Sequence, residues 1–337
     1  MRVGIINATG YIGMDLARLL LRHPDVEVAW VTGRGAAGQR LGDYLPHLDT
    51  VDMAILAEPE DADIVFSALP HKSSAEALLP FVEQGIKVID LSADFRLKDA
   101  SEYRRWYEVE HPSPSLLTRA IYGLPELHRA EIAAASIVAS PGCYPTATLL
   151  ALAPAVKEGL VEPDIIVDAK SGVSGAGRGL TLNTHYSEVN ESVTAYALDG
   201  HRHHPEMLQE FRTLNPALSP SLTFLPHLIP MTRGILATCY ARLSKRVNQA
   251  QVEELYREFY RGAYFVRVTS FSPQTKQALG GNHCLVRPVV DEASGRLVVL
   301  SALDNLVKGG GGQAVQSMNL MLGLPEITGL DTLAIFP

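Results

Sequence analysis

Residues 2–13 read RVGIINATGYIG, an apolar run that leads into a turn and then into a helical pattern. The run at 2–6 predicts a buried strand, and leucines between 16 and 20 recur at helical spacing. Gly10 and Gly13 stand three residues apart at the turn, where missing side chains let the backbone approach a pyrophosphate. The stretch therefore predicts the first strand–turn–helix unit of a doubly wound sheet. The residues expected to face a dinucleotide are Thr9, Gly10, Tyr11, Ile12 and Gly13.

The remainder of the first half continues this pattern. Apolar runs at 26–32, 64–68 and 88–91 lack polar alternation, and a helical pattern at 74–84 separates the last two. Such strands are typical of a parallel sheet that is buried on both faces, with ligands at the carboxyl ends of the strands. Asn7 takes the first glycine position of the usual motif, and it tolerates left-handed geometry well. A tight turn without a ligand is the alternative interpretation.

The end of the second apolar run indicates which dinucleotide is bound. It reads Thr32, Gly33, Arg34, whereas a site that prefers NAD usually offers an acidic residue here to the ribose diol. Arg34, assisted by Thr32, can instead bind a 2′-phosphate through two parallel hydrogen bonds. The pattern favours NADP, with a solvated surface arginine as the alternative.

After residue 143 the pattern changes to that of an α+β domain. Strand-like runs occur at 165–170, 235–243, 265–269, 284–290 and 297–302, and helical patterns at 147–157, 205–214 and 249–260. A mixed or antiparallel sheet with helices on one face fits this arrangement. The last helical pattern, at 310–322, is expected to pack back on the first domain. We therefore expect one domain at 1–142 and 306–337 and another at 143–305.

Composition excludes several classes of protein. The chain has 337 residues, of which 47% are hydrophobic and 20% charged, and a formal net charge of −8. This balance provides no basic field for nucleic acid or for an anionic membrane. No apolar run approaches the roughly 18 residues that span a bilayer, and no signal-peptide pattern precedes the first strand. Three cysteines are too few for a disulfide framework, so a reducing cytoplasmic location is expected.

The sequence Ser-Pro-Gly-Cys-Tyr-Pro-Thr at 140–146 places Cys143 between turn formers and directly before an apolar helical stretch. Unpaired N–H groups and the helix dipole favour a thiolate at a helix N-terminus, and they also offer donors to an oxyanion. Cys143 is therefore the candidate nucleophile. Cys239 and Cys284 lie inside apolar strand patterns and are expected to be buried core residues.

The sequence Gly-His-Arg-His-His-Pro-Glu at 200–206 provides the candidate general base. Proline followed by Glu206 marks a helix start, which puts the histidines on the loop that enters the helix. We expect His203 to be the base and Glu206, three residues on, to orient it, although spacing alone does not exclude His201. A zinc site in a hydrolase is the alternative, but no second metal-binding motif accompanies the cluster. No metal is therefore expected.

A Gly/Ser-rich loop follows the strand-like run at 165–170 and carries Lys170 and Arg178. Exposed N–H groups next to cations suit a phosphate or a carboxylate, and Arg233 is a further candidate cation. A flexible surface loop is the alternative interpretation.

Taken together, these motifs resemble the N-acetyl-gamma-glutamyl-phosphate reductase family, which is related to the aspartate-semialdehyde dehydrogenases. The resemblance covers nearly the whole chain. It rests on residues 7–13, 67–71, 88–97, 122–127, 140–146, 168–178, 185–190, 201–206, 226–231 and 303–309. It implies an α/β protein with a Rossmann-type parallel-sheet domain and an α+β catalytic and dimerisation domain of the semialdehyde dehydrogenase type. A homo-oligomer, either a dimer or a tetramer, is expected.

The resemblance also implies the reaction and its residues. Cys143 would attack the acyl phosphate to form a thioester, and NADPH would reduce the thioester to the semialdehyde as a step in arginine biosynthesis. Besides the residues at the first turn, the implied cofactor-binding residues are Thr32, Arg34, Ser67, Pro70, Ser171, Gly172, Gly175 and Asn305. The implied substrate-binding residues are Arg119, Lys170, Arg178 and His185.

Two further alternatives remain. One is the same chemistry on aminoadipyl phosphate attached to a carrier protein, as in lysine biosynthesis; a carrier would need a basic docking patch, which the acidic balance disfavours. The other is a subunit that senses NADP(H) without catalysis, which predicts loss of the nucleophile or the base. Both residues are present.

Overall fold

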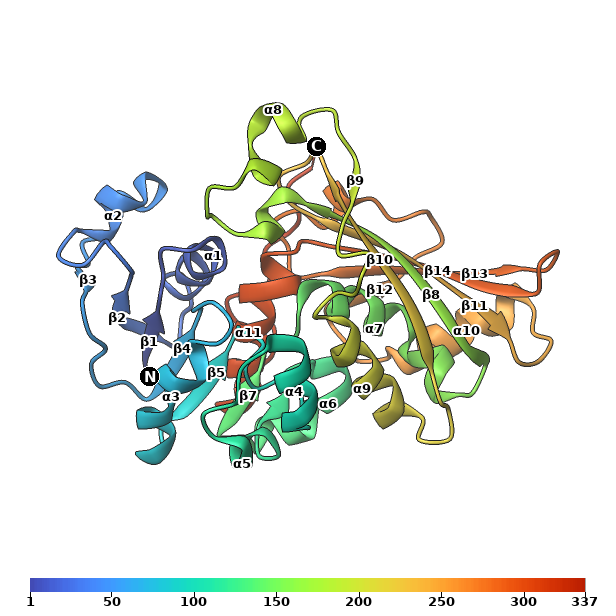
Figure 1. Ribbon diagram of the computed structural model, residues 1–337, viewed down its shortest axis with the longest axis horizontal. Coiled ribbons are helices and arrows are strands. Elements are labelled where there is room, and N and C mark those ends of the chain that lie inside the picture. Colours follow the sequence, from blue (N-terminus) through green and yellow to red (C-terminus); the bar gives the residue numbers. More distant parts are fainter. Residues whose placement is uncertain (337) are drawn as a thin grey trace. The chain divides into compact units, whose positions relative to one another are not determined.

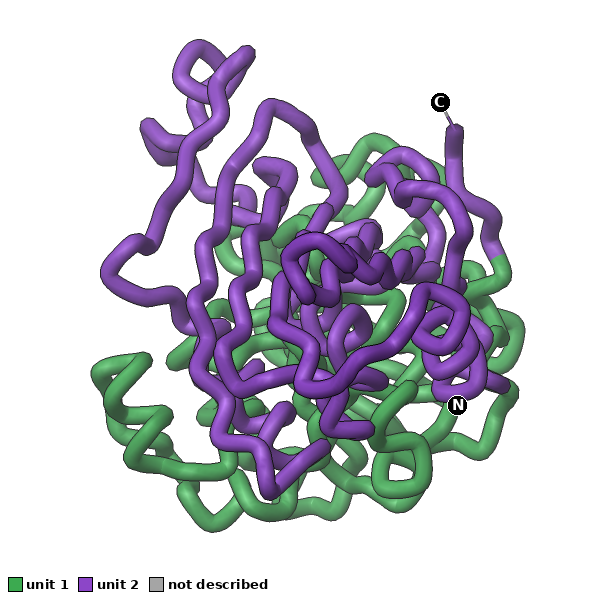
Figure 2. The backbone as a smooth tube through the Cα atoms, turned by 90° about the vertical axis from the view of Figure 1, so that its right-hand side faces the viewer, with its two compact units in different colours: residues 1–141, 310–331 green, residues 142–309, 332–337 purple. Residues whose placement is uncertain are grey.

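A computed structural model of the chain describes residues 1–336, which divide into two units (Figure 2). Unit 1 comprises residues 1–141 and 310–331, and unit 2 comprises residues 142–309 together with the segment from 332 to 336. This division differs from the expected one in that Gly142, residues 306–309 and the last described residues go with unit 2. Each unit has its own sheet, so each is described by itself.

The sheet of unit 1 has seven strands in the order β3-β2-β1-β4-β5-β7-β6, and every pairing is parallel. Its strands are β1 (Arg2–Ile6), β2 (Glu27–Thr32), β3 (Ile55–Leu56), β4 (Ile64–Ser67), β5 (Lys87–Asp90), β6 (Ile121–Tyr122) and β7 (Ile137–Ala139). The chain moves from β1 to β2 on one side and then returns to β4 on the other. The carboxyl ends of β1 and β4 therefore flank a topological switch point, where open parallel sheets bind their ligands.

The helices of unit 1 are α1 (Tyr11–Leu20), α2 (Leu41–Tyr44), α3 (Ser74–Glu83), α4 (Ala100–Tyr107), α5 (Pro114–Leu117), α6 (Pro125–Ala133) and α11 (Gly312–Met321). α11 packs against α1 and α6, as the expected return of the C-terminal helix to the first domain requires. The short elements between 100 and 139 were not expected. Their strands contain two or three residues each, so pairing with a neighbour in space decides them rather than a local pattern.

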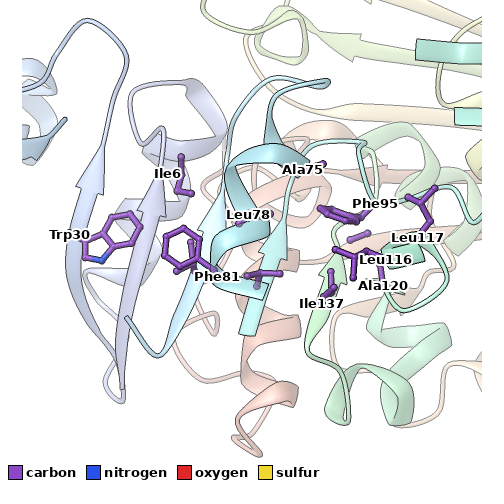
Figure 3. Close-up of a cluster of buried hydrophobic side chains, with 13 residues drawn as sticks. Ile6, Trp30, Ala75, Leu78, Phe81, Phe95, Leu116, Leu117, Ala120 and Ile137 are labelled. Carbon is purple, nitrogen blue, oxygen red and sulfur yellow. The ribbon is translucent and has the colours of Figure 1, made fainter. Parts of the chain in front are cut away.

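A buried apolar cluster joins the sheet to α3 and α5 (Figure 3). Trp30 on β2 stacks on Phe81 of α3 with ring centroids 6.3 Å apart, and Leu78 lies on the same helix. Phe95 and Leu117 extend the cluster toward β7. Removing such side chains from water is the main contribution to the stability of unit 1.

Unit 2 contains a mixed sheet of seven strands in the order β12-β13-β14-β11-β8-β10-β9. The strands are β8 (Val161–Gly172), β9 (Thr194–Ala195), β10 (Ser221–Ile229), β11 (Ile235–Leu243), β12 (Val266–Val268), β13 (Cys284–Asp291) and β14 (Arg296–Leu303). Along β8 the buried residues Ile165, Val167 and Ala169 alternate with the half-buried Asp168 and Lys170. One face of the sheet therefore carries the core of unit 2.

The helices of unit 2 are α7 (Cys143–Lys157), α8 (Tyr186–Val189), α9 (His204–Leu214) and α10 (Gln249–Phe259), as Figure 1 shows. Residues 144–156 of α7 are all buried, and the helix packs on β11 and β14. Pro154 has no N–H group to donate to the carbonyl of Leu150, and the hydroxyl of Tyr260 donates to that carbonyl instead. The proline inside α7 therefore leaves no buried carbonyl unpaired at this position.

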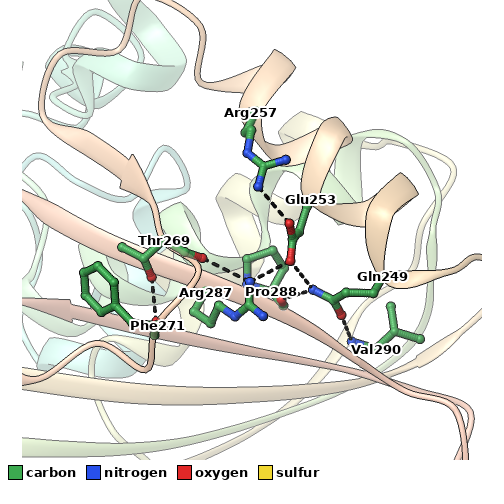
Figure 4. Close-up of polar contacts among 8 residues, drawn as sticks. All are labelled: Gln249, Glu253, Arg257, Thr269, Phe271, Arg287, Pro288 and Val290. Carbon is green, nitrogen blue, oxygen red and sulfur yellow. Dashed lines mark hydrogen bonds and ion pairs between the residues drawn. The ribbon is translucent and has the colours of Figure 1, made fainter.

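A polar cluster fixes α10 to β13 (Figure 4). Glu253 accepts from Gln249 and Arg287, at 2.8 and 2.7 Å, and it also pairs with Arg257. The side-chain hydrogen bonds from Gln249, Arg287 and Arg257 lower the pKa of Glu253 to about 2. Gln249 also accepts from the backbone N–H of Val290, so the helix is bonded to the edge of β13 at two levels.

Candidate active site

The turn between β1 and α1 brings Thr9, Gly10, Tyr11, Ile12 and Gly13 to the carboxyl end of the first strand. Gly10 is the N-cap residue of α1, and its carbonyl accepts from Met14. A Cβ atom on Gly13 would lie 2.3 Å from the carbonyl oxygen of Asn7, a distance that no side chain tolerates. Gly13 therefore lets the helix pack closely against the strand end.

Asn7 joins three strand ends at this turn. Its φ of 66° is in the left-handed region, which asparagine adopts more readily than most residues. Its Nδ2 donates to the carbonyl of Ala68 at 2.8 Å, and its backbone N–H donates to Oγ1 of Thr32 at 3.1 Å. Asparagine at this position replaces a glycine with a side chain that fixes β1, β2 and β4 together.

The end of β2 presents Arg34 to solvent beside the buried Thr32. Within residues 1–336 the Arg34 side chain makes no hydrogen bond or ion pair. Its guanidinium group is therefore available to a ligand at the carboxyl edge of the sheet. The Thr32 hydroxyl already accepts from Asn7, but it keeps its own proton to donate.

Ser67 ends β4 and Pro70 follows the strand at the same edge, and Ser67 belongs to a buried network that sequence reasoning missed. The hydroxyl of Ser74 lies 2.6 Å from that of Ser67 and donates to Oδ1 of Asp90 at 2.5 Å. Burial, with the nearby carboxylate of Asp94 as a second cause, raises the pKa of Asp90 to about 6. The hydroxyl of Ser67 is therefore engaged inside unit 1 rather than exposed to a ligand.

Asp94 caps the N-terminus of α3 in this network. It accepts from the backbone N–H groups of Lys72, Ser74 and Ala75 at 2.8 to 3.0 Å, and from the Tyr103 hydroxyl at 2.9 Å. Lys72, whose N–H donates to this carboxylate, has a φ of 72° and is therefore in the left-handed conformation. The signal in the sequence was a pair of aspartates four residues apart after a buried strand.

In unit 2, Cys143 is the first residue of α7, and Gly142 is its N-cap residue. The cysteine is partly exposed, whereas Cys239 and Cys284 are fully buried, as the sequence predicts. Burial raises the pKa of Cys239 above its usual value. Of the three cysteines, Cys143 alone combines solvent access with the positive end of a helix dipole.

One glycine lies close to the cysteine and another lies close to an imidazole. A Cβ atom on Gly309 would lie 2.8 Å from Cβ of Cys143, and one on Gly142 would lie 2.4 Å from Nε2 of His203. The imidazole of His203 therefore lies directly against the residue before the nucleophile. The structure brings Cys143 and His203 together although they are sixty positions apart in the sequence.

Glu206 is buried at the start of α9, and its Oε1 accepts from the backbone N–H of Gly142 at 2.8 Å. The N–H of Gly142 is therefore satisfied by a carboxylate, whereas the expectation that N–H groups at the N-terminus of α7 bind an oxyanion stays a prediction. The backbone before Cys143 is fixed by a charge-assisted hydrogen bond.

His201 lies in an aromatic cage beside His203. The two imidazole centroids are 4.7 Å apart, and the rings of Tyr144, Tyr196 and Phe224 surround His201 at 5.3 to 5.9 Å. Burial, with the charge of Arg202 as a smaller cause, lowers the pKa of His201 to about 4. Its Nδ1 accepts from the backbone N–H of His203, so a neutral His201 helps to set the conformation of the loop.

Tyr144 and Tyr196 are site residues that the sequence analysis missed. The Tyr196 hydroxyl donates to the Tyr144 hydroxyl at 3.2 Å, and the latter donates to the carbonyl of His227 at 3.2 Å. Burial raises the pKa of Tyr196 to about 12 and raises that of Tyr144 further, so both phenols remain protonated. Adjacency to Cys143 was a signal for Tyr144, but nothing local marked Tyr196.

Ser171 and Gly172 end β8, and the turn after the strand brings Gly175 close to Ser171 and Asn305. A Cβ on Gly175 would lie 3.0 Å from Oγ of Ser171 and 3.8 Å from Nδ2 of Asn305. Asn305 donates to Oγ of Ser174 at 3.0 Å and accepts from the backbone N–H of Gly234 at 2.7 Å. Asn305 therefore fixes two loops of unit 2 to each other.

The candidate cations differ in their surroundings. Lys170 pairs with Asp168 at 2.7 Å, and Nδ1 of His227 lies 3.1 Å from the other oxygen of that carboxylate. Arg178 and His185 are exposed on the segment that follows η2, the 3-10 turn Val173–Ala176. Arg119 is exposed in unit 1. Arg233, weighed as a further cation, lies 3.6 Å from the buried Asp304.

Residues 1–336 contain no group of three or more His, Cys, Asp or Glu side chains arranged to hold a metal ion. Within the same residues, no helix has both the length and the apolar character needed to cross a membrane.

Comparison with known families identifies the class of protein first. Residues 2–135 match the semialdehyde dehydrogenase NAD binding domain, and residues 143–305 match the semialdehyde dehydrogenase dimerisation domain. The chain is therefore an oxidoreductase of the semialdehyde dehydrogenase class. The fold agrees with aspartate semialdehyde dehydrogenase II from Vibrio cholerae, with a TM-score of 0.73, 19% identity and 96% and 98% of the two chains covered. The aspartate semialdehyde dehydrogenase from Candida albicans, solved with NADP, has a TM-score of 0.72 and 15% identity, with 95% of this chain and 98% of that chain covered.

The full-length relatives define the family more narrowly. An N-acetyl-gamma-glutamyl-phosphate reductase from Dehalococcoides mccartyi is 51% identical over 337 residues, which cover 100% of this chain and 99% of the relative. A second, from Pelotomaculum thermopropionicum, is 49% identical with the same coverage. The chain belongs to the N-acetyl-gamma-glutamyl-phosphate reductase family.

Proposed function

We propose that this chain reduces N-acetyl-gamma-glutamyl phosphate to N-acetylglutamate 5-semialdehyde and phosphate with NADPH, as a step in arginine biosynthesis. The observation that carries the proposal is Cys143 at the first position of α7, with the imidazole of His203 against the preceding glycine. The family membership supplies the substrate, since the full-length relatives carry this name.

The residues of unit 1 fit an NADP-type cofactor. Gly10 and Gly13 leave the turn after β1 without side chains at a helix N-terminus, where a pyrophosphate is stabilised. Arg34 offers a guanidinium group at the end of β2. The two preceding positions hold Thr32 and Gly33, neither of which is an acidic residue that could bind a ribose diol. When bound, NADPH supplies the hydride that reduces the thioester carbonyl.

In the proposed mechanism, His203 accepts the proton of the Cys143 thiol, and the sulfur attacks the acyl carbon. The acyl–oxygen bond breaks, phosphate leaves with the bonding electrons, and a thioester remains on Cys143. After reduction, the tetrahedral thiohemiacetal releases the semialdehyde and the thiolate, and His203 returns a proton to the sulfur. The phosphate leaving group activates the carbonyl for attack by sulfur and then departs, which leaves the acyl group as a thioester on Cys143.

The geometry supports His203 over His201 as the base. His201 is enclosed by aromatic rings, and a pKa near 4 leaves it a poor proton acceptor at neutral pH. The expected orientation of His203 by Glu206 stays a prediction, and we propose that Glu206 also positions the nucleophile through the N–H of Gly142.

We further propose that Lys170, Arg178, His185 and Arg119 bind the phosphate or the carboxylate of the substrate, as the resemblance implies. Three of them are exposed or half-buried on unit 2, and Lys170 already carries a carboxylate partner. The match of residues 143–305 to a dimerisation domain supports a homo-oligomer. We also propose that the enzyme acts in the cytoplasm.

The phosphate-dependent reverse reaction tests the function. Wild-type protein is expected to form NADPH from NADP, N-acetylglutamate semialdehyde and phosphate, and to form none when phosphate is omitted. Cys143→Ser is expected to lower turnover by about 10³-fold or more, because an unactivated hydroxyl replaces the thiolate. NADP binding, measured by tryptophan fluorescence of unit 1, is the control and should be unchanged.

A second measurement identifies the covalent step. Wild-type protein incubated with the acyl phosphate in the absence of NADPH should carry an acetylglutamyl group on the Cys143 peptide, and Cys143→Ser should not. Turnover of a carrier-linked aminoadipyl phosphate with no reaction of the glutamyl substrate would instead favour the lysine pathway. The family assignment does not favour that outcome.

A further inference from the structure

A buried carboxylate that takes no part in the proposed proton and acyl transfers lies just after the last strand of unit 2. Asp304 follows β14 and belongs to the stretch 303–309, on which the family resemblance partly rests. Its side chain is 0% exposed. A buried carboxylate is unfavourable unless it accepts hydrogen bonds, so its partners indicate what it stabilises.

The two oxygens of Asp304 accept from different parts of unit 2. Oδ1 accepts from the backbone N–H groups of Leu306 and Val307 at 2.9 and 3.3 Å, which closes the backbone into a turn. Oδ2 accepts from the backbone N–H of Gly280 at 2.8 Å, and it lies 3.6 Å from Nη1 of Arg233. One carboxylate therefore shapes its own turn and holds it to two other segments.

The turn that Asp304 closes, residues 304–309, ends against the candidate nucleophile. The carbonyl of Asp304 accepts from the N–H of Gly309 at 2.9 Å. A Cβ atom on Gly309 would lie 2.8 Å from Cβ of Cys143 and 3.2 Å from its Cα, so the bare backbone of Gly309 fills the space beside the cysteine. A shift of the turn would therefore change the space in which the Cys143 side chain rotates.

We propose that Asp304 is a positioning residue for the nucleophile. Its carboxylate fixes the 304–309 turn, and Gly309 at the end of that turn confines Cys143 in the orientation that attacks the acyl carbon. Misplacement of a reacting group by about 1 Å lowers a rate by up to about 10²-fold, so a small movement of the turn has a large effect on turnover. The effect on turnover rests on the proposed function, whereas the confinement of the thiol does not.

Two substitutions of Asp304 separate the turn from the stability of unit 2. Asp304→Ala removes both acceptors, whereas Asp304→Asn keeps an oxygen for Leu306 and Val307 and faces Gly280 with an N–H group. Both variants should therefore lose the bond to Gly280 and unfold at a lower temperature. Asp304→Ala should also lower kcat by about 10- to 100-fold with NADPH affinity unchanged, whereas Asp304→Asn should stay within about 5-fold of wild type.

Alkylation by iodoacetamide tests the confinement without an assay of activity. Peptide mass spectrometry follows Cys143, with the buried Cys239 and Cys284 as internal controls. In Asp304→Ala the released turn should raise the alkylation rate of Cys143 alone by about 5-fold or more, because access to the sulfur increases, and Asp304→Asn should react as wild type does. An unchanged rate in Asp304→Ala would overturn the proposal. A rise shared by all three cysteines would also overturn it, because the carboxylate would then only stabilise the fold.

Ser301→Ala is the matched control for a purely structural loss. It removes a buried hydrogen bond from the Ser301 hydroxyl to the carbonyl of Ala147 on α7, and it leaves the 304–309 turn intact. This variant should unfold at a lower temperature but keep both kcat and the alkylation rate of Cys143. A Ser301→Ala variant as impaired as Asp304→Ala would reduce Asp304 to a structural role and refute the proposal.

Gly309→Ala tests the other end of the same turn, and it does so even if Asp304→Ala does not fold. The new methyl group enters the space beside Cys143 and should slow both alkylation and turnover. An unchanged alkylation rate in this variant would show that Gly309 does not confine the thiol. If wild-type protein is inactive but the alkylation rates of the variants follow the expected order, the proposed function fails and the positioning role survives.

Discussion

The nucleotide turn of unit 1 is built from seven consecutive residues, 7–13, whereas the cysteine site of unit 2 combines stretches that are far apart in sequence. In the turn, Asn7 and Gly13 contact each other across six positions. In the cysteine site, Gly142 bonds to Glu206 and Gly309 confines Cys143. The first arrangement follows from local backbone geometry, while the second forms only when the chain of unit 2 has folded.

Substitutions in the two regions should therefore have different effects. A change in the turn alters a backbone that must fit within one βα unit, so it should appear in the stability of unit 1 and in cofactor affinity. A change in the cysteine site alters the relative placement of groups that the whole of unit 2 holds, so it should appear in turnover. Small misplacements of reacting groups are costly for rate even when they cost little stability.

The largest expected effect is on the proposed base. His203→Ala should lower kcat by about 10²- to 10⁴-fold, because proton transfer to and from the sulfur loses its catalyst. Steady-state rates measure the effect, and NADPH affinity should not change. His204→Ala is the matched control: this neighbouring imidazole lies 3.0 Å from the carbonyl of Leu222, so its loss should change kcat only a few-fold. An equal loss in both variants would contradict the assignment of the base.

The second effect contrasts two glycines of the turn. Gly13→Ala should destabilise unit 1 by roughly 1–3 kcal/mol, because the new Cβ would lie 2.3 Å from the carbonyl oxygen of Asn7 and the backbone must shift. Gly10→Ala should keep stability within about 1 kcal/mol, since the nearest atom to its Cβ is 3.7 Å away. Both of the chain's tryptophans, Trp30 and Trp106, lie in unit 1, so their fluorescence in urea reports its unfolding.

The same pair of variants tests the use of the turn. If the backbone approaches a pyrophosphate at Gly10, the alanine variant should lose NADPH affinity while keeping its stability. Unchanged NADPH affinity in Gly10→Ala would mean that the turn is only a tight connection between strand and helix.

The third effect concerns Glu206. Glu206→Ala leaves the buried N–H of Gly142 without an acceptor, which should cost about 1–3 kcal/mol of unit 2 stability and lower kcat. Glu206→Gln keeps an acceptor oxygen and should restore most of the stability, measured by thermal inactivation. A glutamine variant that is stable but as slow as the alanine variant would show that the negative charge itself acts, as expected if Glu206 orients a protonated His203.

Sequence reasoning succeeded where the pattern was local. It predicts the parallel sheet, the helix after Cys143 and the burial of Cys239 and Cys284, because each depends on an apolar run or on adjacent turn formers. It does not predict β10, whose apolar residues are interrupted by Pro226 and whose strand character comes from its parallel pairing with β8.

The same limit applies to the site. The nucleophile and the histidine cluster were recognisable from their neighbours in sequence, and the contact between Glu206 and Gly142 was not. Tyr196 and Tyr144 are 52 positions apart; the pairing of β9 with β10 places Tyr196 near β10, and Tyr144 on α7 reaches the same strand by donating to the carbonyl of His227. Contacts of this kind depend on register and topology, which no local pattern encodes.

The last expected effect is confined to a change of pH and lies in the buried network of unit 1. Because Asp90 has a pKa of about 6, the folded chain holds a proton that the unfolded chain releases near pH 4. Stability should therefore fall as pH rises from about 4 to 6 and change no further above that window. Asp90→Asn should remove this contribution, of order 1–3 kcal/mol, which appears as a flatter pH dependence of the tryptophan-monitored urea midpoint.

Asp99 provides the control because its shift has the opposite sign. The Ser101 hydroxyl and backbone N–H lower the pKa of this exposed carboxylate, so its contribution is present above the unfolded pKa and is lost as pH falls. Asp99→Asn should therefore lower stability at neutral pH and leave it unchanged at low pH, so the pH dependence changes in the direction opposite to that of Asp90→Asn. Identical slopes in the two variants would contradict the assignment of the raised pKa of Asp90 to burial.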